Sequence, residues 1–176
     1  MSDDTLLIIP NVFNDTERNT LSQELNNYSW NLNNFSRENL GRPEGRPFWA
    51  KRPFNSVVSK ELFRLKIEAA MRLKVEIKRI HVNGQTHGQC GIWHTDEKCH
   101  DPIDTAFTLV YFPTEWLPEY GGHLLVKINN DVHSILPEFN KGVLFRTTTE
   151  HLGLEPSILC DYMRESIACS FKVLHE

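Results

Sequence analysis

The segment GIWHTDEKCH, residues 91–100, places His94 and Asp96 two positions apart, directly after Trp93. In an extended chain, residues i and i+2 point to the same side, so these two side chains would face one space. An imidazole nitrogen and a carboxylate oxygen that face one point suit a divalent metal ion. The same pair also suits a hydrogen bond on a hydrated surface. The segment alone therefore leaves two interpretations open.

The composition predicts a single domain over residues 1–176. The chain is 40% hydrophobic and 24% charged, which is typical of a globular domain large enough to bury a core. No apolar run approaches the length of a membrane span, and the first residues lack the basic character of a signal peptide. The four cysteines form no CxxC pair, which favours reduced thiols. We therefore expect a cytoplasmic protein.

Charge is unevenly distributed along the chain. Residues 37–79 hold twelve Lys and Arg against five Asp and Glu, so this segment carries +7 and the remainder −11. One interpretation is two solvated faces with salt bridges. The other is a basic rim that steers an acidic partner.

Hydrophobic periodicity divides the chain into helical support with a loop, residues 1–73, and a β-rich core, residues 74–176. In the first part, residues 14–28 predict a helix and residues 59–74 predict a second one. Between them, residues 31–56 are rich in Asn, Gly, Pro and Arg, which predicts a long surface loop.

The ends of the two predicted helices carry capping signals. Asn14 and Glu17 suit a capping box at the start of the first helix. Ser59 is a candidate cap for the second helix. After residue 74, short apolar strands alternate with turns, which is typical of a sandwich or jelly roll. The predicted fold is mainly β, with two helices bracing the sheet.

A third metal ligand is available downstream at His151, a few residues after the strand KGVLF. Two histidines and one carboxylate occupy one face of an octahedral metal ion and leave three positions open for substrates. Nonhaem Fe(II) oxygenases use this arrangement. The set of His94, Asp96 and His151 therefore predicts an iron site.

The last predicted strand, RESIACSFKV, places Arg164, Ser166 and Ala168 on one face. An arginine followed by small residues forms a narrow polar slot in which a guanidinium can bind a carboxylate through two hydrogen bonds. Tyr111, in the strand TAFTLVYF, is a candidate to add a hydroxyl group to that carboxylate. A metal with open positions beside such a slot suits a small dicarboxylic keto acid.

The order WHTD, TLVYFP, YGGHLLV, HLGLEP and MRESI resembles that of the 2-oxoglutarate/Fe(II) dioxygenases, and most closely their prolyl 4-hydroxylase-like branch. The resemblance runs over most of the chain except residues 31–56. It implies a double-stranded β-helix core. The site residues that it implies are His94, Asp96 and His151 for iron, and Arg164, Tyr111 and Ser166 for 2-oxoglutarate.

The resemblance also implies an activity. It implies an enzyme that uses Fe(II), 2-oxoglutarate and O2, releases succinate and CO2, and takes ascorbate as a reductant. The first substrate hypothesis is a prolyl residue of a peptide or protein, with residues 31–56 as a lid. Oxidative demethylation of nucleic acid is disfavoured because Ser170 stands where those relatives carry a second arginine, and because the chain is acidic overall. Hydroxylation of a small molecule and a non-catalytic cupin-like metal-binding module are further alternatives.

Two departures from the family pattern concern the surroundings of the metal site. Arg164 lies thirteen residues after His151, a longer interval than is usual in that branch. The segment before WHTD lacks the tyrosines that the branch often shows, so the residues that line the pocket there are open among Asn83, Gln85 and His87.

A zinc site built from Cys90, His94, Cys99 and His100 is a further alternative. The spacing of these four residues matches no compact zinc finger or ribbon.

Overall fold

A computed structural model describes residues 5–39, 42–52, 54–96 and 106–174. The helices are α1 (Asp15–Asn26), α2 (Val57–Met71) and the short 3-10 helix η2 (Pro118–Tyr120). The strands are β1 (Leu6–Ile9), β2 (Trp30–Asn34), β3 (Arg37–Asn39), β4 (Arg42–Glu44), β5 (Phe48–Lys51), β6 (Val75–Gln85), β7 (Ala106–Phe112), β8 (Leu124–Ile128), β9 (Asp131–Ile135), β10 (Lys141–Arg146), β11 (His151–Gly153) and β12 (Arg164–Val173).

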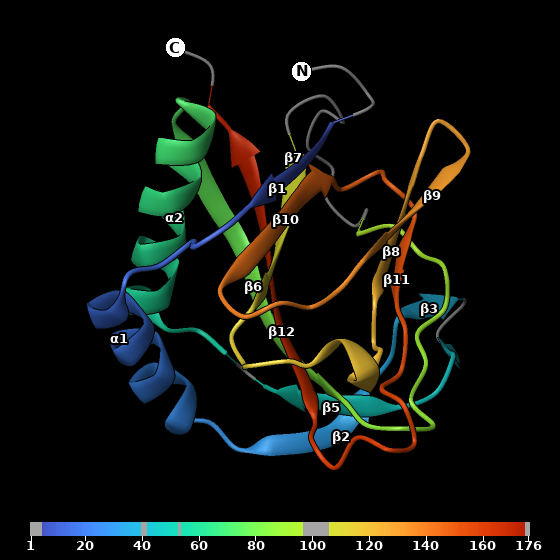
Figure 1. Cartoon of the computed structure of the whole chain (residues 1–176). Helices are drawn as coiled ribbons and strands as arrows, with labels where there is room; N and C mark the ends of the chain where they lie inside the picture. The colour runs from blue at the N-terminus through green and yellow to red at the C-terminus, as the bar shows by residue number, and fades with distance from the viewer. Residues whose placement is uncertain (1–4, 40–41, 53, 97–105, 175–176) are drawn as a thin grey trace.

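Two antiparallel sheets form the body of the molecule. The larger sheet has seven strands in the order β1-β10-β7-β12-β6-β5-β2, and the smaller has three in the order β11-β8-β9. Helices α1 and α2 lie along one side of the large sheet, and β8, β9 and β11 lie on its other side (Figure 1). The predicted architecture, a mainly β jelly-roll core with two bracing helices, is confirmed.

The helix starts follow from local capping. Asn14 and Glu17 form the predicted capping box at the start of α1. Helix α2 begins earlier than predicted because Ser56, not Ser59, is its cap: the Ser56 hydroxyl accepts a hydrogen bond from the Ser59 amide at 3.0 Å. Ser59 instead lies on the buried face of the helix with Phe63.

The prediction of a loop over residues 31–56 is wrong. This segment holds strands β2 to β5, and β5 and β2 extend the large sheet beyond β6. The Asn-rich part of this segment forms β2, which is an edge strand of the sheet and needs a partner on only one side. The division at residue 73 therefore does not separate the helices from the sheet, since β1, β2 and β5 precede it.

Alternation along β12 divides the interior into two layers. Ile167, Cys169 and Phe171 belong to the core between the large sheet and the helices, and all are almost fully buried. Arg164 and Ser166 point to the other side, toward the small sheet, as predicted. That second side holds the site. None of the described helices is long and apolar enough to cross a membrane.

Candidate metal centre and cavity

His94 and His151 are brought together by backbone pairing between distant parts of the chain. The His94 amide donates to the His151 carbonyl at 3.1 Å, and the His151 amide donates to the His94 carbonyl at 2.9 Å. Only this isolated bridge forms here, so His94 lies in an extended segment and not in a continuous strand. The Asp96 amide donates to the carbonyl of Thr147 at 2.9 Å, which fixes the third residue beside the other two.

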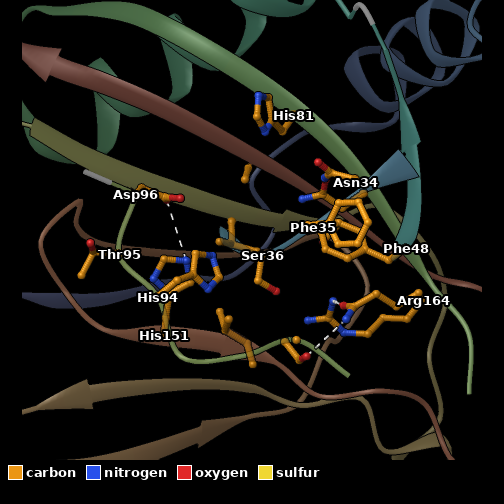
Figure 2. A pocket seen from close by; sticks show the side chains of 18 of the residues that line it. Asn34, Phe35, Ser36, Phe48, His81, His94, Thr95, Asp96, His151 and Arg164 are labelled. Carbon is orange, nitrogen blue, oxygen red and sulfur yellow. Dashed lines mark hydrogen bonds and ion pairs between the residues drawn. The ribbon is translucent and has the colours of Figure 1, made fainter. Parts of the chain in front are cut away.

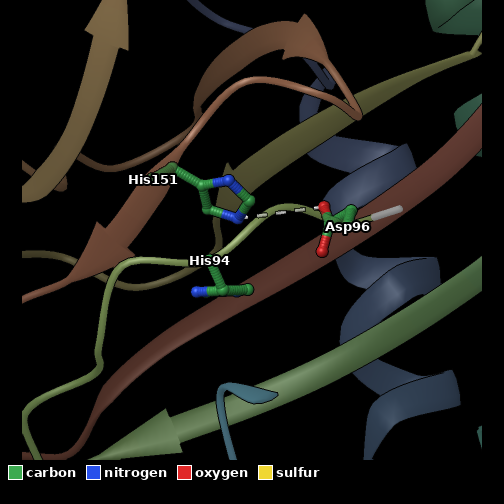
Figure 3. Close-up of side chains that lie close together, drawn as sticks. All are labelled: His94, Asp96 and His151. Carbon is green, nitrogen blue, oxygen red and sulfur yellow. Dashed lines mark ion pairs between the residues drawn. The ribbon is translucent and has the colours of Figure 1, made fainter. Parts of the chain in front are cut away.

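The side chains of His94, Asp96 and His151 converge as predicted. One ligand atom from each residue lies within 4.8 Å of the others (Figure 3). The two imidazole rings are 4.4 Å apart between centroids, and His151 Nε2 lies 3.8 Å from Asp96 Oδ2. Among the described residues, no other group of three or more His, Cys, Asp or Glu side chains meets in this way.

Backbone carbonyls orient both imidazole rings. His94 Nδ1 lies 2.8 Å from the carbonyl oxygen of Ile92, and His151 Nδ1 lies 3.0 Å from that of Thr149. A carbonyl oxygen can only accept, so each Nδ1 carries a proton, which leaves Nε2 as the nitrogen that can bind a metal ion. Such partners are typical of metal-binding histidines because they fix the tautomer and the direction of the ring.

The Asp96 carboxylate is held ionised. Thr108 Oγ1 donates to Asp96 Oδ2 at 2.6 Å. Burial favours the neutral acid, but the charge of His151 and the Thr108 hydrogen bond, together with His94 and Arg79, outweigh it and lower the pKa of Asp96. A carboxylate ligand with a lowered pKa binds a metal ion without first losing a proton.

This donor set fits Fe(II) better than structural zinc. Two imidazoles and one carboxylate leave coordination positions open, whereas a structural zinc site is closed by four ligands. Cys90 does not join the group. Cys99 and His100, the other members of the zinc hypothesis, lie outside the described residues.

A cavity of about 460 Å³ lies between the two sheets. The three candidate metal ligands His94, Asp96 and His151, here called the triad, lie on its wall. Figure 2 shows Arg164 at one side of this cavity and His94, His151 and Asp96 at the other. Strand β6 crosses the cavity wall and contributes alternate residues to it, as a strand must. Those residues are Arg79, His81, Asn83 and Gln85.

Arg164 is a buried cation with no carboxylate partner in the described part of the chain. It is 3% exposed, and its Nη1 donates to Gln85 Oε1 at 2.9 Å. Its Nε donates to the carbonyl oxygen of Gly122. Burial lowers the pKa of Arg164 to about 10, so the guanidinium is still charged at neutral pH. A buried, unpaired charge is costly, which favours an anionic ligand at this end of the cavity.

Two residues that support Arg164, Gln85 and Gly122, were not recognised as such in the sequence. Gln85 orients the guanidinium and is itself held by hydrogen bonds to the carbonyl oxygens of Gln89 and Gly153. Gly122 has a φ of +68°, and a Cβ there would lie 2.9 Å from Arg164 Cδ. In the sequence, the pair Gly121-Gly122 indicates only a turn, and nothing there points to the close approach of Gly122 to Arg164.

Tyr111 does not reach the cavity, so its predicted role is wrong. It shares a face of β7 with Leu109 and packs in the core on the helix side. Its ring contacts Phe13 edge to face at 5.0 Å, and its hydroxyl donates to Asn140 Oδ1 at 3.3 Å. The neighbouring residue Val110 faces the cavity instead. The sequence showed which residues alternate but not which face held the site.

The other candidate pocket residues differ in whether they line the cavity. Ser166, Asn83 and Gln85 line the cavity, whereas His87 is exposed and lies 3.2 Å from the carbonyl oxygen of Pro156. His81, for which no pattern in the sequence indicated a role, also lines the cavity. Asn34, Phe35, Ser36 and Phe48, from the segment predicted to be a lid, form part of the wall.

The three-dimensional structure is similar to solved oxygenases. A prolyl hydroxylase from Trichoplax adhaerens, in complex with a hypoxia-inducible-factor peptide fragment, superimposes with a TM-score of 0.67 at 15% identity over 97% of this chain and 84% of that one. A prolyl-4-hydroxylase from Pseudomonas putida gives 0.64 at 17% identity over 97% and 93%. The chain has the fold of the 2-oxoglutarate/Fe(II) oxygenases.

Solved structures with this fold hold chemically different molecules, since one contains a peptide fragment and another contains hygromycin B. HygX from Streptomyces hygroscopicus, with nickel, 2-oxoglutarate and hygromycin B bound, superimposes with a TM-score of 0.66 at 12% identity over 97% of this chain and 83% of that one. No protein-family model matches the sequence, and no curated protein matches it significantly. The fold is therefore established by structure, and the activity is a matter for proposal.

Proposed function

We propose that this chain is an Fe(II)- and 2-oxoglutarate-dependent dioxygenase that hydroxylates a prolyl residue of a peptide or protein. The observation that carries the proposal is the placement of an unpaired buried cation, Arg164, in the same cavity as three converging metal ligands. A dicarboxylic keto acid has one end that suits an open metal site and another that suits a guanidinium.

The protein's own groups would have defined tasks in this reaction. His94, Asp96 and His151 would hold the iron. Arg164, oriented by Gln85, would bind the distal carboxylate of 2-oxoglutarate. Iron with 2-oxoglutarate and O2 supplies the oxidising power and gives succinate and CO2. The chain supplies binding, orientation and exclusion of water. Ser166 is a candidate for a hydrogen bond to the same carboxylate.

The prolyl substrate is supported by two observations. Prolyl hydroxylases are among the structures with the same fold. The cavity wall also includes Phe35, Pro43 and Phe48, which offer apolar surface for a pyrrolidine ring. The use of ascorbate and the cytoplasmic location stay predictions from the sequence.

A small-molecule substrate is the second candidate. The cavity volume of about 460 Å³ is within the range of ordinary small-molecule sites. HygX, which has the same fold, was solved with the small molecule hygromycin B.

The test is turnover with a panel of proline-containing peptides in the presence of Fe(II), 2-oxoglutarate and O2. We expect succinate to form in proportion to peptide that gains one oxygen atom on proline. His94→Ala should abolish both products, while His133→Ala, an exposed histidine on β9, should change neither. Succinate without proline oxidation in any peptide would contradict the prolyl assignment and favour the second candidate.

A further inference from the structure

The end of the cavity away from Arg164 also carries positive charge. On β6, Gln85 contacts Arg164, and Arg79 lies six residues earlier on the same face of the strand. At about 3.3 Å per residue, the two positions are roughly 20 Å apart along the strand. Arg79 Nη2 lies 3.9 Å from Asp96 Oδ1, so this second basic region is beside the metal ligands.

Arg52 joins Arg79 in this region. It follows β5, the neighbour of β6 in the sheet, and also lines the cavity. The pKa of Arg52 is lowered, first by burial and second by the charge of Arg79, which indicates that the two guanidinium groups repel each other. No carboxylate in the described part of the chain is within ion-pair distance of Arg52. The nearest acid to Arg79 is Asp96, which is committed to the metal in our proposal.

His81 lies on the same face of β6, two residues from Arg79. Burial, followed by the charges of Arg79 and Arg52, lowers the pKa of His81 to about 4. A neutral imidazole at this position does not add to the repulsion and can accept or donate a hydrogen bond.

Access distinguishes this end from the Arg164 end. The side chain of Arg79 is 41% exposed and Arg52 is also exposed, whereas Arg164 is 3% exposed. Arg52 and Arg79 are therefore accessible to a molecule in solvent, whereas Arg164 is not.

We propose that Arg52 and Arg79 form a substrate subsite that binds the carboxylate side chain of an acidic peptide beside the residue to be oxidised. This inference rests on the proposed function and names the substrate more narrowly. In the described part of the chain, the only acid within ion-pair distance of these two guanidiniums is Asp96, 3.9 Å from Arg79. The excess positive charge suits a carboxylate, which a guanidinium can bind through two hydrogen bonds. The chain has a net charge of −4, which disfavours nucleic acid, since its binding needs a row of phosphate contacts.

The test compares two fluorescein-labelled peptides of equal length with a central proline, one carrying two Glu residues near it and the other Gln at the same positions. Binding is followed by anisotropy under anaerobic conditions with Fe(II) and 2-oxoglutarate present. We expect the Glu peptide to bind about tenfold more tightly at low salt, because two partly exposed ion pairs are modest and additive. The preference should shrink as salt is raised.

Matched variants assign the preference to the subsite. Arg52→Gln should reduce the preference to about threefold or less. Arg72→Gln removes a charge from the same basic segment at the end of α2, which lies on the opposite side of the sheet, and should leave the preference intact. An equal loss in both variants would show a general charge effect and overturn the subsite.

Other outcomes also overturn the inference. Equal affinity for the two peptides in the unmodified protein, or no measurable binding of either, would contradict it. Tighter binding of oligothymidylate, with a steep salt dependence, would favour nucleic acid instead. Binding of Fe(II) and 2-oxoglutarate is measured on the same protein, so that failure of the subsite can be distinguished from failure of the proposed function. If both ligands bind but the preference for the Glu peptide is absent, only the subsite proposal fails.

Discussion

The two ends of the cavity differ in how firmly their cations are held. At the closed end, Arg164 is almost fully buried and its guanidinium is fixed by Gln85 and the Gly122 carbonyl. At the open end, Arg52 is exposed and Arg79 is partly exposed, and the charge of Arg79 lowers the pKa of Arg52. A fixed cation suits a ligand that is the same in every turnover, and exposed cations suit recognition of a variable partner. The metal ligands lie beside the open end, since Arg79 is 3.9 Å from Asp96, and across the cavity from Arg164 (Figure 2).

The largest expected effect is at the triad itself. Replacement of His151 by Ala removes one of three ligands, and we expect the affinity for Fe(II) to fall by more than about 100-fold, because loss of an outer-shell partner alone costs about 10- to 100-fold. Anaerobic titration with Fe(II) measures this. His133→Ala is the matched control, and unchanged iron affinity in His151→Ala would remove the triad from the account.

At the closed end, Arg164→Met should weaken 2-oxoglutarate binding by about 100-fold, since a charge-assisted pair is worth about 1.5–3 kcal/mol. Arg164→Lys keeps the charge but loses the planar fork, and a loss of about tenfold is expected. Equilibrium binding at saturating Fe(II) distinguishes the two. Wild-type affinity in Arg164→Met would show that the buried cation does not bind the keto acid.

Replacement of Gln85, which orients Arg164, should have a smaller effect on 2-oxoglutarate binding than replacement of Arg164 itself. Gln85→Leu removes the acceptor for Arg164 Nη1 and should weaken 2-oxoglutarate binding by about tenfold without changing the affinity for Fe(II). Gln85→Glu should weaken it further, because the new carboxylate would pair with Arg164 in place of the ligand. Equal or better binding in Gln85→Glu would show that Arg164 has another partner.

The smallest expected effect concerns Tyr111, on the helix side of the sheet. Tyr111→Phe removes one hydrogen bond to Asn140 and should lower the free energy of unfolding by about 1 kcal/mol. The affinity for 2-oxoglutarate should stay within about twofold of the unmodified protein. Denaturant titration measures the free energy of unfolding, and ligand titration measures the affinity. A tenfold loss of affinity would place the hydroxyl in the site after all.

Local chemistry made much of this structure predictable. The capping box of α1 and the alternation along β12 follow from short-range rules, and both were predicted correctly. The triad was predictable because metal ligation demands few residue types in a restricted order. The face of β7 that lines the cavity was not predictable. Alternation shows that Tyr111 and Val110 lie on opposite faces of the sheet, but it does not show which face lines the cavity.

Long-range contacts account for what the sequence did not reveal. Gln85 and Arg164 are 79 positions apart and meet because β6 pairs with β12 in a register that sets them opposite each other. The strands between residues 31 and 51 were missed because their polar composition resembles that of a loop. Strand β5 forms because β6 offers it an edge to pair with, and β2 then pairs with β5, which no local pattern records.

The most direct test of the account is anaerobic titration of Fe(II) and 2-oxoglutarate into the metal-free protein. The account predicts a weak visible metal-to-ligand charge-transfer band that requires both additions. It also predicts that the band is lost in Arg164→Met at the same ligand concentration and retained in His133→Ala. Iron binding without the band in the unmodified protein would contradict the assignment of the cavity to 2-oxoglutarate and leave a metal-binding module as the better account.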